Sequence, residues 1–128
     1  MISRIFGVFL FFIMLTVEGA EFSVGASEED AQETVGCLFP MSGRGGLYGR
    51  DSVAGIQLAF EHIEVQPYQS PPIRVLFSDT SSKASKAARQ VRNFVRQNKV
   101  RFICGVVNSS IALQVAQEIG RASCRERV

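Results

Sequence analysis

The 128-residue sequence has no tryptophan, one histidine and three cysteines. With His62 alone and no Cys-x-x-Cys pair, it has no convincing set of ligands for a metal ion. A catalytic set of nucleophile, base and orienting group also needs a second histidine or another evident base. We therefore predict no enzyme, no metal site and no cofactor, and we expect His62 to be a solvated surface residue.

An excess of charge of either sign is also missing. The net charge is +2 for the whole chain. Residues 27–118 contain ten Lys and Arg against nine Asp and Glu, which leaves +1. This balance gives no electrostatic reason to bind nucleic acid or an anionic membrane, so we expect neither as a partner.

The sequence does contain a long apolar run near its start, at residues 5–17, followed by small residues. That layout is typical of a secretory signal peptide. As a helix the run spans roughly 20 Å, less than the ~30 Å core of a bilayer, so we expect no uncleaved anchor. We predict that residues 1–26 are signal peptide and leader, cleaved after Ala20 or Ala26. The protein is then periplasmic or secreted, with no membrane insertion after cleavage.

The segments that flank the middle of the chain have a different character. Residues 27–33 are acidic and polar without periodicity, which predicts a linker between leader and domain. Residues 119–128 share neither periodicity nor composition with the preceding segment and resemble the translation of a sequencing-library adapter. We expect this tail, with Cys124, to be non-native, the natural product having been cut off at Glu118. The alternative is an ordinary basic C-terminus.

Residues 34–118 alternate short apolar runs with amphipathic segments. The apolar runs predict buried strands, and apolar residues at steps of three and four predict helices. The expected strands are 34–40, 73–77 and 100–107, and the expected helices are 48–64, 82–98 and 108–118. Strands that alternate with helices predict an α/β fold: a Rossmann-like parallel sheet with helices on both faces.

In open sheets of this kind, ligands bind beyond the carboxyl ends of the strands. This rule selects three loops, at 41–49, 78–82 and 108–110. The first has four glycines, but their spacing is not G-x-G-x-x-G and no Gly-Lys-Ser/Thr follows, so we predict no nucleotide site. In the third, Asn108-Ser109-Ser110 can cap a helix or bind a carboxylate at its N-terminus, and the cap is the commoner use.

Two features of the expected strands and helices stay open. Cys37 and Cys104 lie within strands, where buried thiols are the usual state, although an oxidising compartment also permits a disulfide. The cations of segment 82–98 lie opposite its apolar stripe. We expect them to form a solvated face, although a partner could bind there.

Four stretches in matching order and spacing resemble the leucine/isoleucine/valine-binding family of type I periplasmic solute-binding proteins. They are FPMSGRGGLYG at 39–49, GIQLAF at 55–60, SDT at 78–80 and FICGVVNSS at 102–110. The similarity covers residues 34–118. It implies that this chain is the N-terminal part of a two-lobed clamshell, with an incomplete first lobe. Such a receptor encloses an amino acid or similar small polar solute and presents it to the membrane permease of an ABC transporter.

The resemblance also implies roles for single residues. Tyr48 would contact the ligand from the first loop, and Ser109, with Ser110 beside it, would bind the ligand's carboxylate. Asp79 occupies a strand-end aspartate position that we expect to be structural. Some members close a disulfide between loop cysteines, and we do not carry that bridge over to the strand cysteines of this chain. An alternative function with the same fold is a regulatory envelope protein or a receptor ectodomain.

Overall fold

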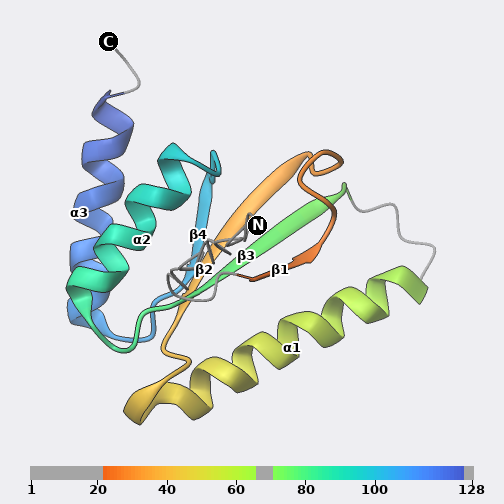
Figure 1. Cartoon of the computed structure of the whole chain (residues 1–128), viewed down its shortest axis with the longest axis horizontal. Helices are drawn as coiled ribbons and strands as arrows, with labels where there is room; N and C mark the ends of the chain where they lie inside the picture. Colours follow the sequence, from red (N-terminus) through yellow and green to blue (C-terminus); the bar gives the residue numbers. More distant parts are fainter. Residues whose placement is uncertain (1–21, 66–70, 126–128) are drawn as a thin grey trace, which may run out of the picture.

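The computed structural model describes residues 22–65 and 71–125 (Figure 1). The expected signal peptide up to residue 21 and the last three residues of the expected tail lie outside the described residues. Within the described ranges, no helix is both long enough and apolar enough to cross a membrane.

Strands and helices alternate from residue 33 onward, as the sequence predicts. The elements are β1 (Phe22–Gly25), β2 (Glu33–Phe39), the 3-10 turn η1 (Gly43–Gly45), α1 (Gly46–Val65), β3 (Ile73–Asp79), α2 (Ala84–Arg96), β4 (Phe102–Gly105) and α3 (Ser109–Arg125). The strands form one sheet in the order β1-β3-β2-β4. β2 pairs in parallel with both β3 and β4, and β1 pairs antiparallel to β3.

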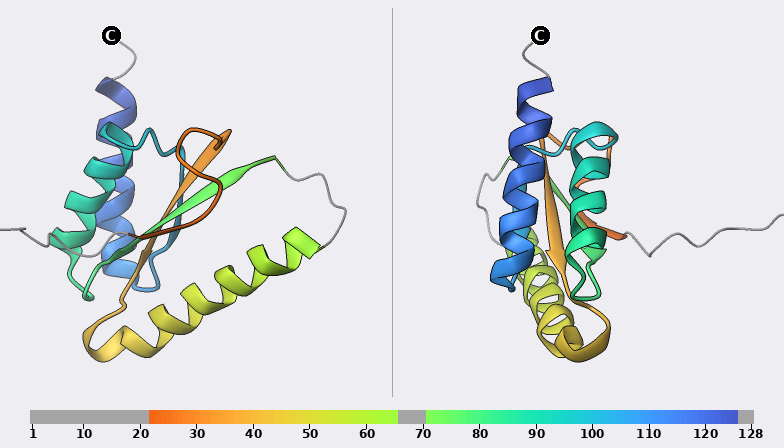
Figure 2. Two further views of the ribbon diagram at one scale, coloured as in Figure 1. Left: turned by 45° about the vertical axis from the view of Figure 1, so that its right-hand side comes forward. Right: turned by 90° about the vertical axis from the view of Figure 1, so that its left-hand side faces the viewer.

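The side chains of the strands alternate between two apolar layers, one on each face of the sheet. On one face, Leu38 and Leu76 pack with buried residues of α2 and α3, among them Phe94 and Ile111. On the other face, the core joins Cys37, Phe39, Val75 and Phe77 of the strands to Val53 of α1. Figures 1 and 2 show α2 and α3 side by side and α1 apart from them. The prediction of helices on both faces is therefore confirmed.

One glycine of β2 sets how closely α2 approaches the sheet. Phe94 of α2 is fully buried, and its ring lies where a Cβ of Gly36 would project. A larger residue at Gly36 would therefore displace the ring. Burying a phenylalanine side chain contributes about 1.5–3 kcal/mol, so this contact is a substantial part of the α2 interface.

β1 is the element that the sequence analysis did not expect. Residues 22–25 were placed in the leader, but they form an edge strand in which Phe22 stacks on Phe77 with ring centroids 4.9 Å apart. The predicted linker 27–33 is also more structured than expected. Its Ser27 side chain bonds to Asp30, Gln32 N–H donates to the Pro72 carbonyl, and Glu33 already belongs to β2.

One strand, one loop and one helix end at other residues than the sequence predicts. The strand expected at 100–107 shortens to β4, because Lys99 on one side and Gly105 and Val106 on the other have positive φ angles. The loop expected at 41–49 ends early, since α1 begins at Gly46. The third helix continues past residue 118 to Arg125, into the segment expected to be a tail.

Candidate functional site

The carboxyl ends of β2 and β4 border the point at which the chain reverses its winding. From β2 the chain crosses over through α1 to β3 on one side, and then through α2 to β4 on the other side of β2. Open α/β sheets bind their ligands beyond the strand ends at such a reversal. We call these two strand ends, with the segments that follow them, the β2/β4 switch point.

Tyr48 lies on the β2 side of the switch point. It stands where the predicted loop 41–49 overlaps the predicted helix 48–64, and it belongs to the first turn of α1, which directly follows η1. The hydroxyl of Ser52 donates to the Tyr48 carbonyl at 2.7 Å, while 74% of Tyr48 is exposed. The backbone is thus held in a helix, and the ring is free to contact a ligand.

Ser109 and Ser110 begin α3 on the β4 side. Oδ1 of Asn108 accepts hydrogen bonds from the backbone N–H of Ser110 at 2.9 Å and from its hydroxyl at 2.7 Å. Asn108 therefore caps the helix together with Ser110. Ser109 is exposed, and its hydroxyl has no hydrogen-bond partner among the residues that the structure describes. The predicted helix cap is therefore present, with Asn108 as its acceptor and Ser110 as its donor. The carboxylate-binding role predicted for Ser109 and Ser110 stays a prediction.

The backbone before this cap turns sharply. Gly105 and Val106 have φ angles of +85° and +60°, and Val106 N–H donates to the Leu38 carbonyl at 2.8 Å. A Cβ on Gly105 would collide with that same carbonyl, so the close approach requires glycine. Left-handed backbone is strained for a β-branched residue such as Val106. These two left-handed residues, of which Val106 is strained, direct the chain from the end of β4 into the start of α3.

Asp79, at the end of β3, joins two of the loops at the carboxyl end of the sheet. Its carboxylate accepts hydrogen bonds from the Met41 N–H at 2.8 Å, the Ser42 hydroxyl at 2.6 Å and the Ser81 N–H at 2.8 Å. Lys86 adds an ion pair at 3.5 Å. Because these partners come from both sides, the carboxylate ties the loop after β2 to the loop after β3. This geometry is that of a structural residue, as the sequence analysis expected.

The same contacts set the protonation state of Asp79. Partial burial alone would raise its pKa, but the hydrogen bonds from Ser42, Ser81 and Met41 favour the charged form and together outweigh burial. They hold the pKa of Asp79 well below the usual range of a carboxyl group. Asp79 therefore stays ionised wherever the protein is folded near neutral pH.

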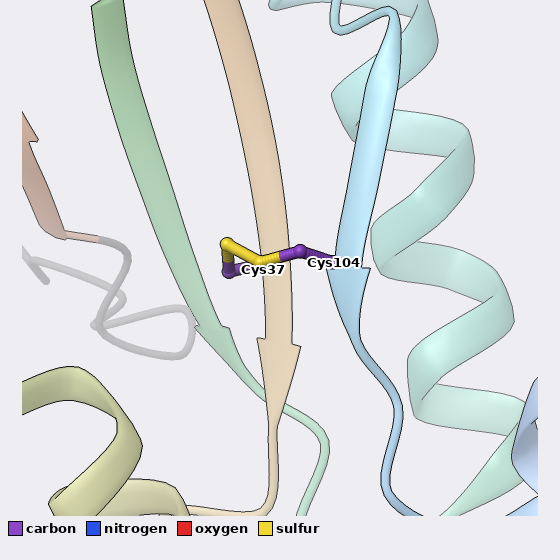
Figure 3. Close-up of a disulfide and its surroundings, with 2 residues drawn as sticks. All are labelled: Cys37 and Cys104. Atoms are coloured by element: carbon purple, nitrogen blue, oxygen red, sulfur yellow. A yellow bond between two sulfur atoms is a disulfide. The ribbon is translucent and has the colours of Figure 1, made fainter. Parts of the chain in front are cut away.

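A disulfide joins the two strands of the switch point. Cys37 of β2 and Cys104 of β4 are direct partners in the parallel register, with their Cα atoms 4.5 Å apart (Figure 3). The choice between buried thiols and a disulfide, which the sequence left open, is settled for the disulfide. It lies on the α1 face of the sheet, where Cys37 is almost completely buried and Cys104 is partly exposed.

A cavity of about 780 Å³ lies away from this edge, near the C-terminal ends of α2 and α3. It is lined by cations of the α2 end and by Arg121, and Glu118 pairs with Arg92 at 3.1 Å and with Arg121 at 3.0 Å. Cations at helix C-termini complement the partial negative charge of the last carbonyl groups. Arg96, in the last turn of α2, is placed for this role. The described residues hold no group of three or more potential metal ligands.

The sequence analysis missed the partners of Asp79 and the pairing of the cysteines. Ser42 and Ser81 lie in two of the loops that it selected, so the signal was a serine in each loop beside a strand-end aspartate. For Cys37 and Cys104 the signal was weaker. Their similar distance from the two strand ends becomes informative only once β2 and β4 are known to be neighbours.

Comparisons with known proteins agree on one family. A family model described as "Periplasmic binding protein" matches residues 33–122. The amino acid ABC transporter substrate-binding protein from Pseudomonas fluorescens Pf-5 is 36% identical, with a TM-score of 0.58, over 71% of this chain and 24% of its own. No match is found among curated proteins.

Two further solved structures have the same fold. The branched-chain amino acid transporter substrate-binding protein LivJ from Streptococcus pneumoniae, in complex with isoleucine, is 27% identical with a TM-score of 0.61, over 70% of this chain and 26% of its own. A branched-chain amino acid ABC transporter periplasmic ligand-binding protein from Burkholderia xenovorans LB400 is 29% identical with a TM-score of 0.60, over 72% and 25%. The chain spans about a quarter of the length of these structures.

Proposed function

Because this chain belongs to the periplasmic binding protein family, we propose that it is part of an extracytoplasmic solute-binding protein of an ABC transporter. The proposed ligand is an amino acid or a similar small polar solute. Support comes from the solved structures above, which are substrate-binding or ligand-binding proteins of amino acid transporters and not enzymes. The proposed partner is the membrane permease of the transporter.

One observation carries the proposal: a serine at a helix N-terminus, at the switch point, without a partner for its hydroxyl. The first backbone N–H groups of α3 lack partners within the helix, and the helix dipole places partial positive charge there. A ligand carboxylate matches that environment. The Ser109 hydroxyl supplies a further donor, and the Asn108 cap holds the first turn in place.

Tyr48 supplies the other side of the proposed site. It follows β2, whereas Ser109 follows β4, and these strands are parallel neighbours, so both residues lie at the same edge of the sheet. An exposed aromatic ring offers apolar area for a ligand side chain at low entropic cost, because only two side-chain torsions must be fixed. In this proposal the serine selects the carboxylate and the tyrosine contacts the rest of the ligand.

The disulfide supports an extracytoplasmic location. Disulfides persist in oxidising compartments and are rare in the cytosol. The Cys37–Cys104 link lies within the sheet, between neighbouring strands, as part of the fold. The expected signal peptide gives the same location, periplasmic or secreted.

Calorimetric titration of the complete gene product with a panel of L-amino acids tests the proposal. We expect at least one amino acid to bind, and Ser109→Ala to weaken its binding by about tenfold to a hundredfold, because a hydrogen bond to a charged group contributes about 1.5–3 kcal/mol. The control is Ser85→Ala, which removes an exposed serine from the first turn of α2 at the same edge but away from the switch point. Binding of no amino acid, or equal weakening by both variants, would contradict the proposal.

A further inference from the structure

We propose that the Cys37–Cys104 disulfide is a positioning link for the ligand site, so that its reduction weakens ligand binding. This inference rests on the proposed function. It concerns a covalent bond between the two strands whose ends border the switch point. The cysteines do not touch the ligand in this proposal. They act by holding the end of β4, and with it the start of α3, against β2.

The contact between β2 and β4 is short. β4 has four residues, Phe102 to Gly105, and each pairs with one residue of β2. Among the described strands, β2 is the partner of β4. No crossover connects the two strands directly, because the chain passes through β3 and α2 between them. The disulfide therefore adds a covalent constraint to a pairing of only four residues.

The link lies close to the groups that it would position. Cys104 is followed by the left-handed Gly105 and Val106, then by the capping Asn108 and by Ser109. The strained Val106 is anchored through the hydrogen bond from its N–H to the carbonyl of Leu38, which is next to Cys37 along β2. Strained backbone persists only where the surroundings hold it in place. Loss of the disulfide removes one of these restraints and lets the turn relax.

The other side of the sheet shows why the restraint matters at this place. β2 and β3 pair over seven residues, and Asp79 further ties the loops that follow them. No comparable side-chain network joins the loop after β4 to the loop after β2 among the described residues. In its place, the disulfide links β2 to β4 shortly before these two loops begin.

The redox step is an ordinary exchange with a dithiol. A thiolate of the dithiol attacks one sulfur of the pair, and its second thiol then releases the mixed disulfide. Two electrons and two protons pass to Cys37 and Cys104, which become thiols, and the dithiol becomes a cyclic disulfide. Cys104 is partly exposed, which gives a reductant access to the bond.

Thermodynamic linkage makes the proposal quantitative. Coupling between two sites typically changes affinity by 5- to 150-fold, and we expect about tenfold weaker amino acid binding after reduction. Reciprocity then requires the bound amino acid to shift the thiol–disulfide equilibrium by the same factor toward the disulfide. Tenfold corresponds to about 30 mV for this two-electron couple. A bond that only stabilises the fold would not produce this ligand-dependent shift as long as the reduced protein stays folded, which circular dichroism of the reduced protein checks.

The test uses the complete gene product with dithiothreitol as the dithiol and the amino acid that binds best. Affinity is measured by calorimetry for the oxidised protein, the reduced protein and the double variant C37A/C104A. The disulfide equilibrium of the unmodified protein is measured in redox buffers with and without ligand, which needs no variant to fold. Hydrogen exchange of the amides at 106–111 reports the local loosening. Val75→Ala, in the same core on β3, controls for lost stability.

We expect weaker binding for the reduced protein and for C37A/C104A, faster exchange at 106–111, unchanged affinity for Val75→Ala and a tenfold ligand effect on the equilibrium. Equal affinities in the oxidised and reduced forms, with no ligand effect on the equilibrium, overturn this inference and leave the proposed function intact. If the oxidised protein binds no amino acid, the proposed function is overturned first, and this inference with it.

Discussion

Two loops at the same edge of the sheet use their polar groups in opposite ways. After β3, the carboxylate of Asp79 is saturated by donors from Met41, Ser42 and Ser81. After β4, Asn108 and Ser110 satisfy each other, and the Ser109 hydroxyl is left exposed. Both loops are among the three that the sequence nominates for ligand binding, although Asp79 itself was expected to be structural. Position at a strand end nominates a residue, and the state of its hydrogen bonds distinguishes the structural role of Asp79 from the binding role that we propose for Ser109.

The largest effect that separates the two loops is expected from Asp79→Ala. Several partners lose a charged acceptor at once, and we expect the free energy of unfolding to fall by about 3 kcal/mol. The measurement is urea-induced unfolding followed by circular dichroism. Asp51→Ala, at an exposed position of α1, is the matched control and should change stability by less than about 0.5 kcal/mol. Similar losses for both variants would show that the Asp79 network is unimportant.

Acid sensitivity sharpens the same comparison. The folded protein holds the pKa of Asp79 below the value of about 3.9 in an unfolded chain. The stabilisation from its charged form is therefore fully present above that unfolded value and is lost as the pH falls toward the folded pKa. Within this window we expect Asp79 to contribute a slope of up to about 1.4 kcal/mol per pH unit. Unfolding measured from pH 2.5 to 7 should give a shallower slope for Asp79→Asn, and equal slopes would refute the assignment.

A smaller effect is expected at the start of α3. Asn108→Ala removes the helix cap, which typically costs about 1 kcal/mol of stability. Thermal unfolding of the variant and of the parent protein measures this difference. A change of less than about 0.3 kcal/mol would mean that the bonds to Ser110 contribute little to the helix.

The smallest effect on stability is expected from Ser109→Ala. Its hydroxyl has no partner among the described residues, so we expect a change within about 0.5 kcal/mol, together with the loss of ligand affinity described above. Thermal unfolding without ligand gives the stability, and calorimetry gives the affinity. A destabilisation as large as that of Asn108→Ala would assign Ser109 to the helix cap instead of the ligand site.

The fold from residue 33 onward follows from periodicity. The apolar stripe of α2, including Ala87, Val91 and Phe94, is buried as its spacing predicts, and the strand alternation predicts the two-sided core. β1 escaped because four residues, Phe22 to Gly25, carry too little pattern to be told from a leader. Its pairing with β3 joins segments about fifty residues apart, so the residues of β1 alone do not indicate it.

The candidate site was also predictable in part. The rule for parallel sheets places Tyr48 and Ser109 at one edge from sequence alone, because only the direction of the strands matters. The division of roles between Ser109 and Ser110 depends on which hydroxyl Asn108 engages, which is decided by local geometry. The disulfide depends on the strand order β1-β3-β2-β4, and a strand's neighbours are not encoded in its own residues.

The edge strand β1 has a consequence for the predicted cleavage of the signal peptide. Of the two processing positions that the sequence suggests, a cut after Ala20 leaves Phe22 to Gly25 on the β3 edge, and a cut after Ala26 discards them. The second cut would uncover a row of unpaired backbone groups, a known template for self-association. If the predicted signal peptide is removed, the position of the cut therefore sets whether β1 still covers the outer edge of β3, and N-terminal sequencing of the processed protein would show which position is used.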